Sequence, residues 1–122
     1  NFAAVDAGFN FLARPMLCDS YHHVLAAGHA EEPEAETYTV VGPICETGDI
    51  LAKERRLPLL QRGDILAFLD AGAYGFSMAS QYNGQPRPAE VLVAGSSTDV
   101  IRSREDASSL LAGQRILPRL MF

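Results

Sequence analysis

Short apolar runs separated by turn residues recur along the chain, and they predict a series of short β-strands. Glycine, proline and asparagine lie between most of these runs, and such residues are typical of turns. We expect strands at Phe2–Asp6, Tyr21–Ala26, Tyr38–Val41, Asp49–Lys53, Asp64–Leu69, Glu90–Val93 and Val100–Ser103. The run at Asp64–Leu69 is mostly apolar, so we expect that strand to be buried. The pattern favours a mainly β fold, a barrel or a sandwich, with one or two short helices.

The helical signals are weaker and lie between the strands. Phe11–Leu17 predicts a short helix, because Pro15 suits the first turn of a helix better than its middle. Residues 106–112 predict a second helix, with Asp106 as N-cap and Gly113 just past its end. The other segments are a helical turn at Phe76–Ser80, a solvated acidic loop at His29–Glu36, and an apolar tail at Ile116–Phe122 that Pro118 interrupts.

Composition and charge limit the classes of function. The 122 residues suggest one domain, and the net charge of −5, without a basic stripe, argues against nucleic acid or an anionic membrane as partner. No apolar run approaches the roughly 20 residues needed to span a bilayer, and no signal-peptide pattern opens the chain. Cys18 and Cys45 form neither a CxxC motif nor a metal-ligand pair, so reduced thiols in a cytoplasmic protein are the simplest interpretation.

The three histidines do not predict a metal site. His22 and His23 are adjacent and would point to opposite faces of a strand, which makes them poor ligands for one ion. We therefore expect them, with His29, to be structural. The sequence contains no P-loop, no dinucleotide-binding fingerprint and no Ser-His-Asp arrangement that can be recognised.

The segment Gly42–Asp49 concentrates reactive side chains between two predicted strands. Its sequence, Gly-Pro-Ile-Cys-Glu-Thr-Gly-Asp, places a thiol and two carboxylates between glycines that predict a tight loop. A thiol beside a carboxylate suits proton donation together with recognition of a cationic substrate group. On spacing alone, a packed Cys45 with solvated acids in a connector is the alternative interpretation.

Four segments share their order and spacing with one known family. They are Val5-Asp6-Ala7-Gly8 followed by Leu12-Ala13-Arg14-Pro15; Gly42-Pro43 with Cys45-Glu46-Thr47-Gly48-Asp49; Gly63-Asp64 with Asp70-Ala71-Gly72-Ala73-Tyr74-Gly75; and Asn83 with Arg87-Pro88-Ala89-Glu90-Val91-Leu92-Val93. Together they resemble the C-terminal domain of pyridoxal-phosphate decarboxylases of the alanine-racemase-like fold type, nearest to the diaminopimelate decarboxylase branch. The resemblance extends from Phe2 to about Arg104.

The resemblance implies that residues 1–122 are a single C-terminal β domain. In that family a β/α barrel precedes this domain and carries the lysine that binds pyridoxal phosphate, and the active site lies between two subunits of a homodimer. The chain begins at Asn1 without a methionine, as expected for the interior of a longer protein. Its only lysine, Lys53, does not match the cofactor-binding lysine, so we interpret it as an exposed strand residue. The sequence leaves open whether the fragment is natural, and what its oligomeric state is.

The resemblance also assigns roles to individual residues. Decarboxylation of an amino acid leaves electrons on the α carbon, the cofactor absorbs them, and the protein must return a proton. Cys45 matches the proton donor, Glu46 the acid that binds a distal ammonium, and Arg14 the arginine that grips a substrate carboxylate. Tyr74 matches a tyrosine that contacts cofactor or substrate. The alternatives are a packed thiol, a solvated acid, a surface salt bridge and a core tyrosine, and for Asp49 we expect a structural role at the loop end.

Cys18 departs from the pattern. The diaminopimelate enzymes usually have a tyrosine four residues after the motif arginine, and here Cys18 takes its place while Tyr21 matches the next tyrosine. Thr47 in place of the usual serine is a milder change, because the hydroxyl remains. The shorter side chain of Cys18 would enlarge the pocket. A bulkier carboxylated substrate, of the kind used in siderophore or antibiotic pathways, therefore remains an alternative.

These observations lead to one main hypothesis and two others. The chain would be part of a pyridoxal-phosphate decarboxylase that acts on a diaminopimelate-like small amino acid with a second carboxylate, in lysine biosynthesis. It would be inactive alone, because the cofactor-binding lysine lies outside it. A catalytically silent β domain for dimerisation or regulation is the second hypothesis. A racemase is the third, but no motif here supplies the second base that it would need.

Overall fold

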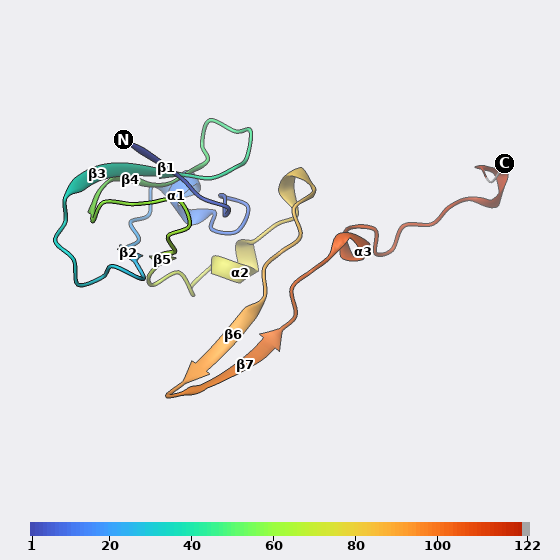
Figure 1. The fold of residues 1–122 in the computed structure, drawn as a ribbon. Helices are drawn as coiled ribbons and strands as arrows, with labels where there is room; N and C mark the ends of the chain where they lie inside the picture. The colour runs from blue at the N-terminus through green and yellow to red at the C-terminus, as the bar shows by residue number, and fades with distance from the viewer. Residues whose placement is uncertain (121–122) are drawn as a thin grey trace. The chain divides into compact units, whose positions relative to one another are not determined.

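The computed structural model describes residues 1–120, which form two compact units, unit 1 at Asn1–Ala79 and unit 2 beginning at Ser80 (Figure 1). In chain order the elements are β1 (Phe2–Ala4), α1 (Arg14–Cys18), β2 (Val24–Ala26), β3 (Glu36–Val41), β4 (Ile50–Leu57), β5 (Leu66–Phe68), α2 (Gly75–Met78), η1 (Tyr82–Gly84), β6 (Glu90–Ala94), β7 (Ser97–Arg102), α3 (Ala107–Leu110) and η2 (Pro118–Leu120). The predicted mainly β fold is confirmed, and residues 1–120 contain three short α-helices where one or two were expected.

Unit 1 contains two sheets. β1 pairs in parallel with β3, which pairs antiparallel with β4, and β2 pairs antiparallel with β5. Both sheets are open, and the described residues form no closed barrel. Every predicted strand is present, although the bounds differ by a few residues at most ends.

The longest strand, β4, continues beyond the predicted end at Lys53. The β3–β4 register shifts between Tyr38 and Val40, and Glu54 adopts a positive φ of 50° at this bulge. The backbone N–H of Glu54 leaves the ladder and donates to Thr39 Oγ1 at 3.4 Å. A bulge adds a residue without ending the pairing. The charged residues after Lys53 therefore belong to the strand, and the predicted end was wrong.

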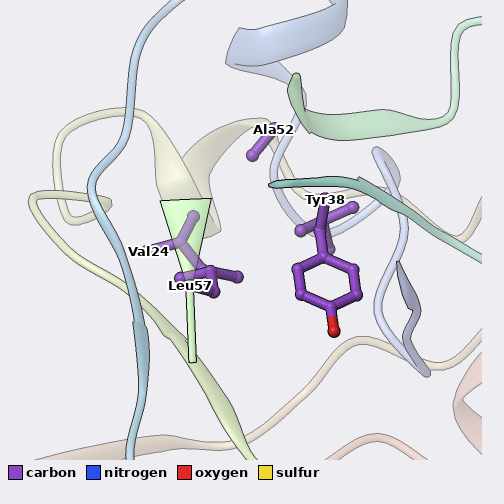
Figure 2. Close-up of a cluster of buried hydrophobic side chains, with 5 residues drawn as sticks. Val24, Tyr38, Ala52 and Leu57 are labelled. Atoms are coloured by element: carbon purple, nitrogen blue, oxygen red, sulfur yellow. The ribbon is translucent and has the colours of Figure 1, made fainter. Parts of the chain in front are cut away.

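Side chains from both sheets of unit 1 share one core. Figure 2 shows the buried cluster, whose members are Val24, Tyr38, Val40, Ala52 and Leu57. Half-buried Leu66 and Phe68 from β5 pack against it, so the prediction that this strand is buried was wrong. The hydroxyl oxygen of Tyr38 accepts the backbone N–H of Leu60 at 3.2 Å. Burial of each large apolar side chain contributes about 1.5–3 kcal/mol.

Unit 2 contains the β6–β7 hairpin, whose turn places Gly95 at a positive φ of 60°. Arg87 and Glu105 brace the unit, because the guanidinium Nε and the backbone N–H of Arg87 each donate to the Glu105 carboxylate at 2.9 Å. α3 begins at the predicted N-cap, where Asp106 and Ser109 form a reciprocal capping box. Of the predicted apolar tail, Met121 and Phe122 lie outside the described residues.

Candidate functional site

The loop 42–49 connects β3 to β4 and is closed by its own backbone. Gly42 N–H donates to the Asp49 carbonyl at 3.0 Å, and Asp49 N–H donates to the Glu46 carbonyl at 3.0 Å. Glu46 N–H in turn donates to the Ile44 carbonyl at 2.8 Å. These bonds shape a compact loop, as predicted, in which Ile44 is buried and the following residues lie at the surface.

Cys45 and Glu46 lie exposed at the tip of this loop. Cys45 is not in a disulfide, and its exposed position makes the interpretation as a packed core thiol wrong. The Glu46 carboxylate accepts a long hydrogen bond of 3.5 Å from the hydroxyl of Thr47. A thiol and a carboxylate at neighbouring positions thus face outward from unit 1, where a group from outside this unit can reach both.

Asp49, in contrast, points into the protein and is only 4% exposed. Its Oδ1 accepts the backbone N–H of Phe9, and its Oδ2 accepts the backbone N–H of Ile44, both at 2.7 Å. The expected structural role of Asp49 at the loop end agrees with these contacts. The partner Phe9 lies far away in the sequence, and no local pattern identifies it.

α1 lies against the same loop. A Cβ on Gly48 would come within 2.8 Å of Met16 Cγ, so the loop backbone and the helix touch where a side chain would not fit. Pro15 occupies the first turn of α1, as predicted, and Asp19, with a left-handed φ of 52°, is the C-cap that follows the last helical residue, Cys18. The close approach places the segment that carries Arg14 beside the loop that carries Cys45.

Arg14 and Tyr74 are brought together from distant parts of the chain. The guanidinium carbon of Arg14 lies 5.1 Å from the centroid of the Tyr74 ring, a cation–π arrangement. Arg14 is half-buried and its Nε donates to Ser20 Oγ at 3.3 Å. Tyr74 is 58% exposed and has a positive φ of 61° immediately before α2. Its exposure makes the alternative interpretation as a core tyrosine wrong.

Cys18, at the end of α1, borders a surface groove. The Cys18 thiol donates to the Arg14 carbonyl at 3.2 Å, and the groove, of about 480 Å³, runs between α1 and the start of β4. Thr47 and Gly48 line it from the loop. The two departures from the family pattern, Cys18 and Thr47, therefore border the same groove.

Lys53 is 62% exposed in its side chain and pairs with Asp19, with Nζ and Oδ1 2.8 Å apart. This hydrogen bond and the nearby positive charge hold the pKa of Asp19 below its ordinary value. Lys53 is thus an exposed strand residue, as predicted. Tyr21, the tyrosine that matches the family pattern, lies under the guanidinium of Arg55 at 4.1 Å from its centroid.

Two of the three histidine side chains, those of His22 and His29, make hydrogen bonds within the protein. His22 is buried and its Nδ1 lies 3.1 Å from the Leu69 carbonyl, whereas His23 is exposed. His29 Nδ1 lies 2.9 Å from Glu32 Oε1, and this hydrogen bond raises the pKa of His29. Within residues 1–120, no group of three or more His, Cys, Asp or Glu side chains could hold a metal ion. No helix in that part of the chain is long and apolar enough to cross a membrane.

The sequence matches a family model described as the C-terminal sheet domain of the pyridoxal-dependent decarboxylases, over residues 1–72. This range is more than half of the 122 residues. The chain belongs to this family. As a pyridoxal-dependent decarboxylase sheet domain, it carries Arg14, Cys45 and Glu46 inside the matched range, whereas Tyr74 lies just beyond it.

Named relatives and solved structures agree with this family. The chain is 57% identical to a diaminopimelate decarboxylase of Archaeoglobus fulgidus over 116 residues, covering 95% of this chain and 28% of that protein. It is 52% identical to the diaminopimelate decarboxylase of Methanothermobacter thermautotrophicus, with 98% and 28% covered. A diaminopimelate decarboxylase of M. jannaschii, solved with L-lysine, superposes with a TM-score of 0.90 at 36% identity, covering 98% of this chain and 27% of that one.

Proposed function

We propose that the chain is the sheet domain of a pyridoxal-phosphate-dependent decarboxylase that acts on diaminopimelate or a similar amino acid with a second carboxylate. The observation that carries the proposal is the exposed Cys45–Glu46 tip, held on a loop that contacts the Arg14 helix. Sequence identity of 57% to a protein named diaminopimelate decarboxylase supports the substrate class, and the chain spans about 28% of that relative's length. We place the enzyme in the cytoplasm, in the synthesis of lysine.

The donor set of the chain fits a cofactor that is held mainly by another domain. When bound, pyridoxal phosphate draws electrons from the α carbon of an amino acid. The only lysine of this chain, Lys53, is ion-paired with Asp19, so the cofactor-binding lysine would come from elsewhere. Tyr74 offers an exposed phenol beside a guanidinium, and its hydroxyl would hydrogen-bond the cofactor or the substrate.

The other residues would orient the substrate and supply the proton. Arg14 presents a planar fork to the remote carboxylate, and its stacking on Tyr74 limits the directions in which the fork can point. Glu46 would accept hydrogen bonds from the remote ammonium. Cys45 would donate its thiol proton to the α carbon after carbon dioxide leaves.

The architecture of the whole protein follows from this proposal. Residues 1–122 would form one C-terminal domain after a cofactor-binding β/α barrel, and the active site would lie at the interface of a homodimer. Strands from outside this chain would complete the open sheets of unit 1 into a barrel or sandwich. The exposed tip of the loop would then face the barrel that holds the cofactor.

The similarity to named decarboxylases favours this enzyme function over a silent dimerisation or regulatory domain. One observation supports a second candidate substrate. Cys18, which occupies the position of a tyrosine in the family pattern, borders the groove. A shorter side chain there favours a bulkier carboxylated amino acid, of the type found in siderophore or antibiotic pathways.

The proposal is tested with the full-length protein and with the isolated chain. Purified full-length protein is incubated with pyridoxal phosphate and diaminopimelate, and lysine is detected by mass spectrometry. We expect lysine from the full-length protein and none from the isolated chain, which should also show no stoichiometric cofactor absorbance band. Absence of lysine, with turnover of a bulkier carboxylated amino acid, would select the second substrate, and absence of any turnover would contradict the proposal.

A further inference from the structure

A single buried carboxylate joins the two segments that carry the proposed substrate contacts. We propose that Asp49 is a positioning residue that fixes the Arg14 segment relative to the Cys45–Glu46 loop, and thereby sets the spacing between the carboxylate and ammonium contacts. This inference rests on the proposed function, because it concerns how the same site holds a substrate with two charged ends.

The hydrogen bonds of Asp49 run in two directions. Oδ1 accepts the N–H of Phe9 and Oδ2 accepts the N–H of Ile44, each at 2.7 Å. Ile44 directly precedes Cys45 in the loop. Phe9 lies in the turn before α1, where Phe11 N–H donates to the Gly8 carbonyl at 2.9 Å. One oxygen of Asp49 therefore holds the loop, and the other holds the turn from which the Arg14 helix starts.

Steric contacts around the carboxylate make this junction tight. A Cβ on Gly42 would clash with Asp49 Oδ2 and would lie 2.6 Å from the Cα of Gly8. A Cβ on Gly8 would lie 2.8 Å from Ile44 Cγ1 and 3.0 Å from Asp49 Oδ1. Glycine at both positions lets two backbone segments and a carboxylate meet without a side chain between them. Neither segment can shift without breaking these contacts.

The junction depends on a buried carboxylate that is held by backbone hydrogen bonds. Asp49 is 4% exposed, and none of the ion pairs formed within residues 1–120 includes it. A buried carboxylate is costly unless hydrogen-bond donors surround it, and bonds to a charged acceptor are about twice as strong as neutral ones. A neutral amide at this position would accept only one of the two N–H groups, because its nitrogen is a donor.

The test compares three variants of the full-length protein: Asp49→Asn, Gly42→Ala and the control Val24→Ala. Val24 is a buried core residue of β2 that lies outside the loop, so Val24→Ala lowers stability by weakening core packing and not by changing the junction. In Asp49→Asn we expect the KM for diaminopimelate to rise about tenfold, the change that follows from losing one charge-assisted hydrogen bond, while kcat changes less. Gly42→Ala should have the same effect by displacing the carboxylate, and should remain informative if Asp49→Asn does not fold.

Amide hydrogen exchange provides a readout that does not need the activity. Phe9 and Ile44 amides should lose protection about tenfold or more in Asp49→Asn, whereas Val24→Ala should leave them protected at an equal melting temperature. If KM and these amides behave as in the control, the inference is overturned. A wild-type protein that does not decarboxylate would contradict the proposed function instead, and the exchange measurement would still decide whether Asp49 joins the two segments.

Discussion

The guanidinium of Arg14 lies over the ring of Tyr74, with 5.1 Å between its central carbon and the ring centroid. At an exposed site such a contact contributes about 0.5–1 kcal/mol. The contact matters mainly for geometry, because it limits the orientations of the long Arg14 side chain, which is proposed to hold a carboxylate. α1 supplies the arginine and the segment before α2 supplies the ring, so two elements far apart in sequence bring these two side chains together.

The ring and the hydroxyl of Tyr74 can be separated experimentally. In the full-length protein, Tyr74→Phe keeps the stacked ring and removes the hydroxyl, so we expect weaker cofactor binding with little change in the KM for the substrate. Tyr74→Leu removes both and should raise the KM as well, by roughly two- to fivefold for a contact of about 0.5–1 kcal/mol. Cofactor titration and steady-state kinetics measure the two effects. Equal KM values in the two variants would argue against a role for the stacking.

Glu46 should control recognition of the remote ammonium. Glu46→Gln removes one negative charge, and the loss of a charged hydrogen bond should raise the KM for diaminopimelate about 10- to 150-fold. Glu31→Gln makes the same chemical change at an exposed site in the acidic loop and should leave the KM unchanged. Steady-state kinetics of the two variants side by side provide the measurement. A Glu46 variant that behaves like the Glu31 variant would remove Glu46 from the site.

The Arg87–Glu105 contact predicts an acid-dependent loss of stability. Hydrogen bonds from Arg87 and Gln81 lower the pKa of Glu105 from its ordinary value of 4.5 to about 2. Since the pKa is lower in the folded state, the contact contributes its full stabilisation above pH 4.5 and loses it as the pH falls towards 2. Urea unfolding of wild type and Glu105→Gln from pH 2 to 6 should give free energies that converge at low pH. A constant difference across this range would contradict the assignment.

Two leucines near the end of β4 provide a matched pair for the core of unit 1. Leu57 is 3% exposed within the buried cluster (Figure 2), whereas Leu59 is 64% exposed. Leu57→Ala should lower the free energy of unfolding by about 2–5 kcal/mol, and Leu59→Ala should change it by less than about 0.5 kcal/mol. Denaturant unfolding measures both. Similar losses in the two variants would mean that the cluster is not the main core.

Local sequence signals predicted the strands, the tight loop and the first turn of α1, because turn residues and Pro15 act within a few positions. They did not predict the continuation of β4, since the bulge at Glu54 depends on pairing with β3. The buried position of β5 was also predicted wrongly, because an apolar run does not show how much of a strand its partners cover.

Only part of the candidate site could be predicted from the sequence. The motif predicted that Cys45 and Glu46 would lie together on one loop. The structural role expected for Asp49 agrees with the two hydrogen bonds that its carboxylate accepts. The contacts of Asp49 with Phe9, and of Arg14 with Tyr74, join residues that no local period relates. Such contacts arise from tertiary packing, and in the sequence the glycine at one close approach, Gly42, is a sign of it.

Replacement of Cys45 tests the central claim most directly. In the full-length protein with pyridoxal phosphate, kcat for formation of lysine from diaminopimelate is compared between wild type and Cys45→Ala. If the thiol donates the proton, we expect kcat to fall by about 10²- to 10⁴-fold, the usual contribution of a positioned acid, with the cofactor still bound. A Cys45→Ala enzyme whose kcat stays within about twofold of wild type, well below the contribution of any positioned acid, would contradict the account.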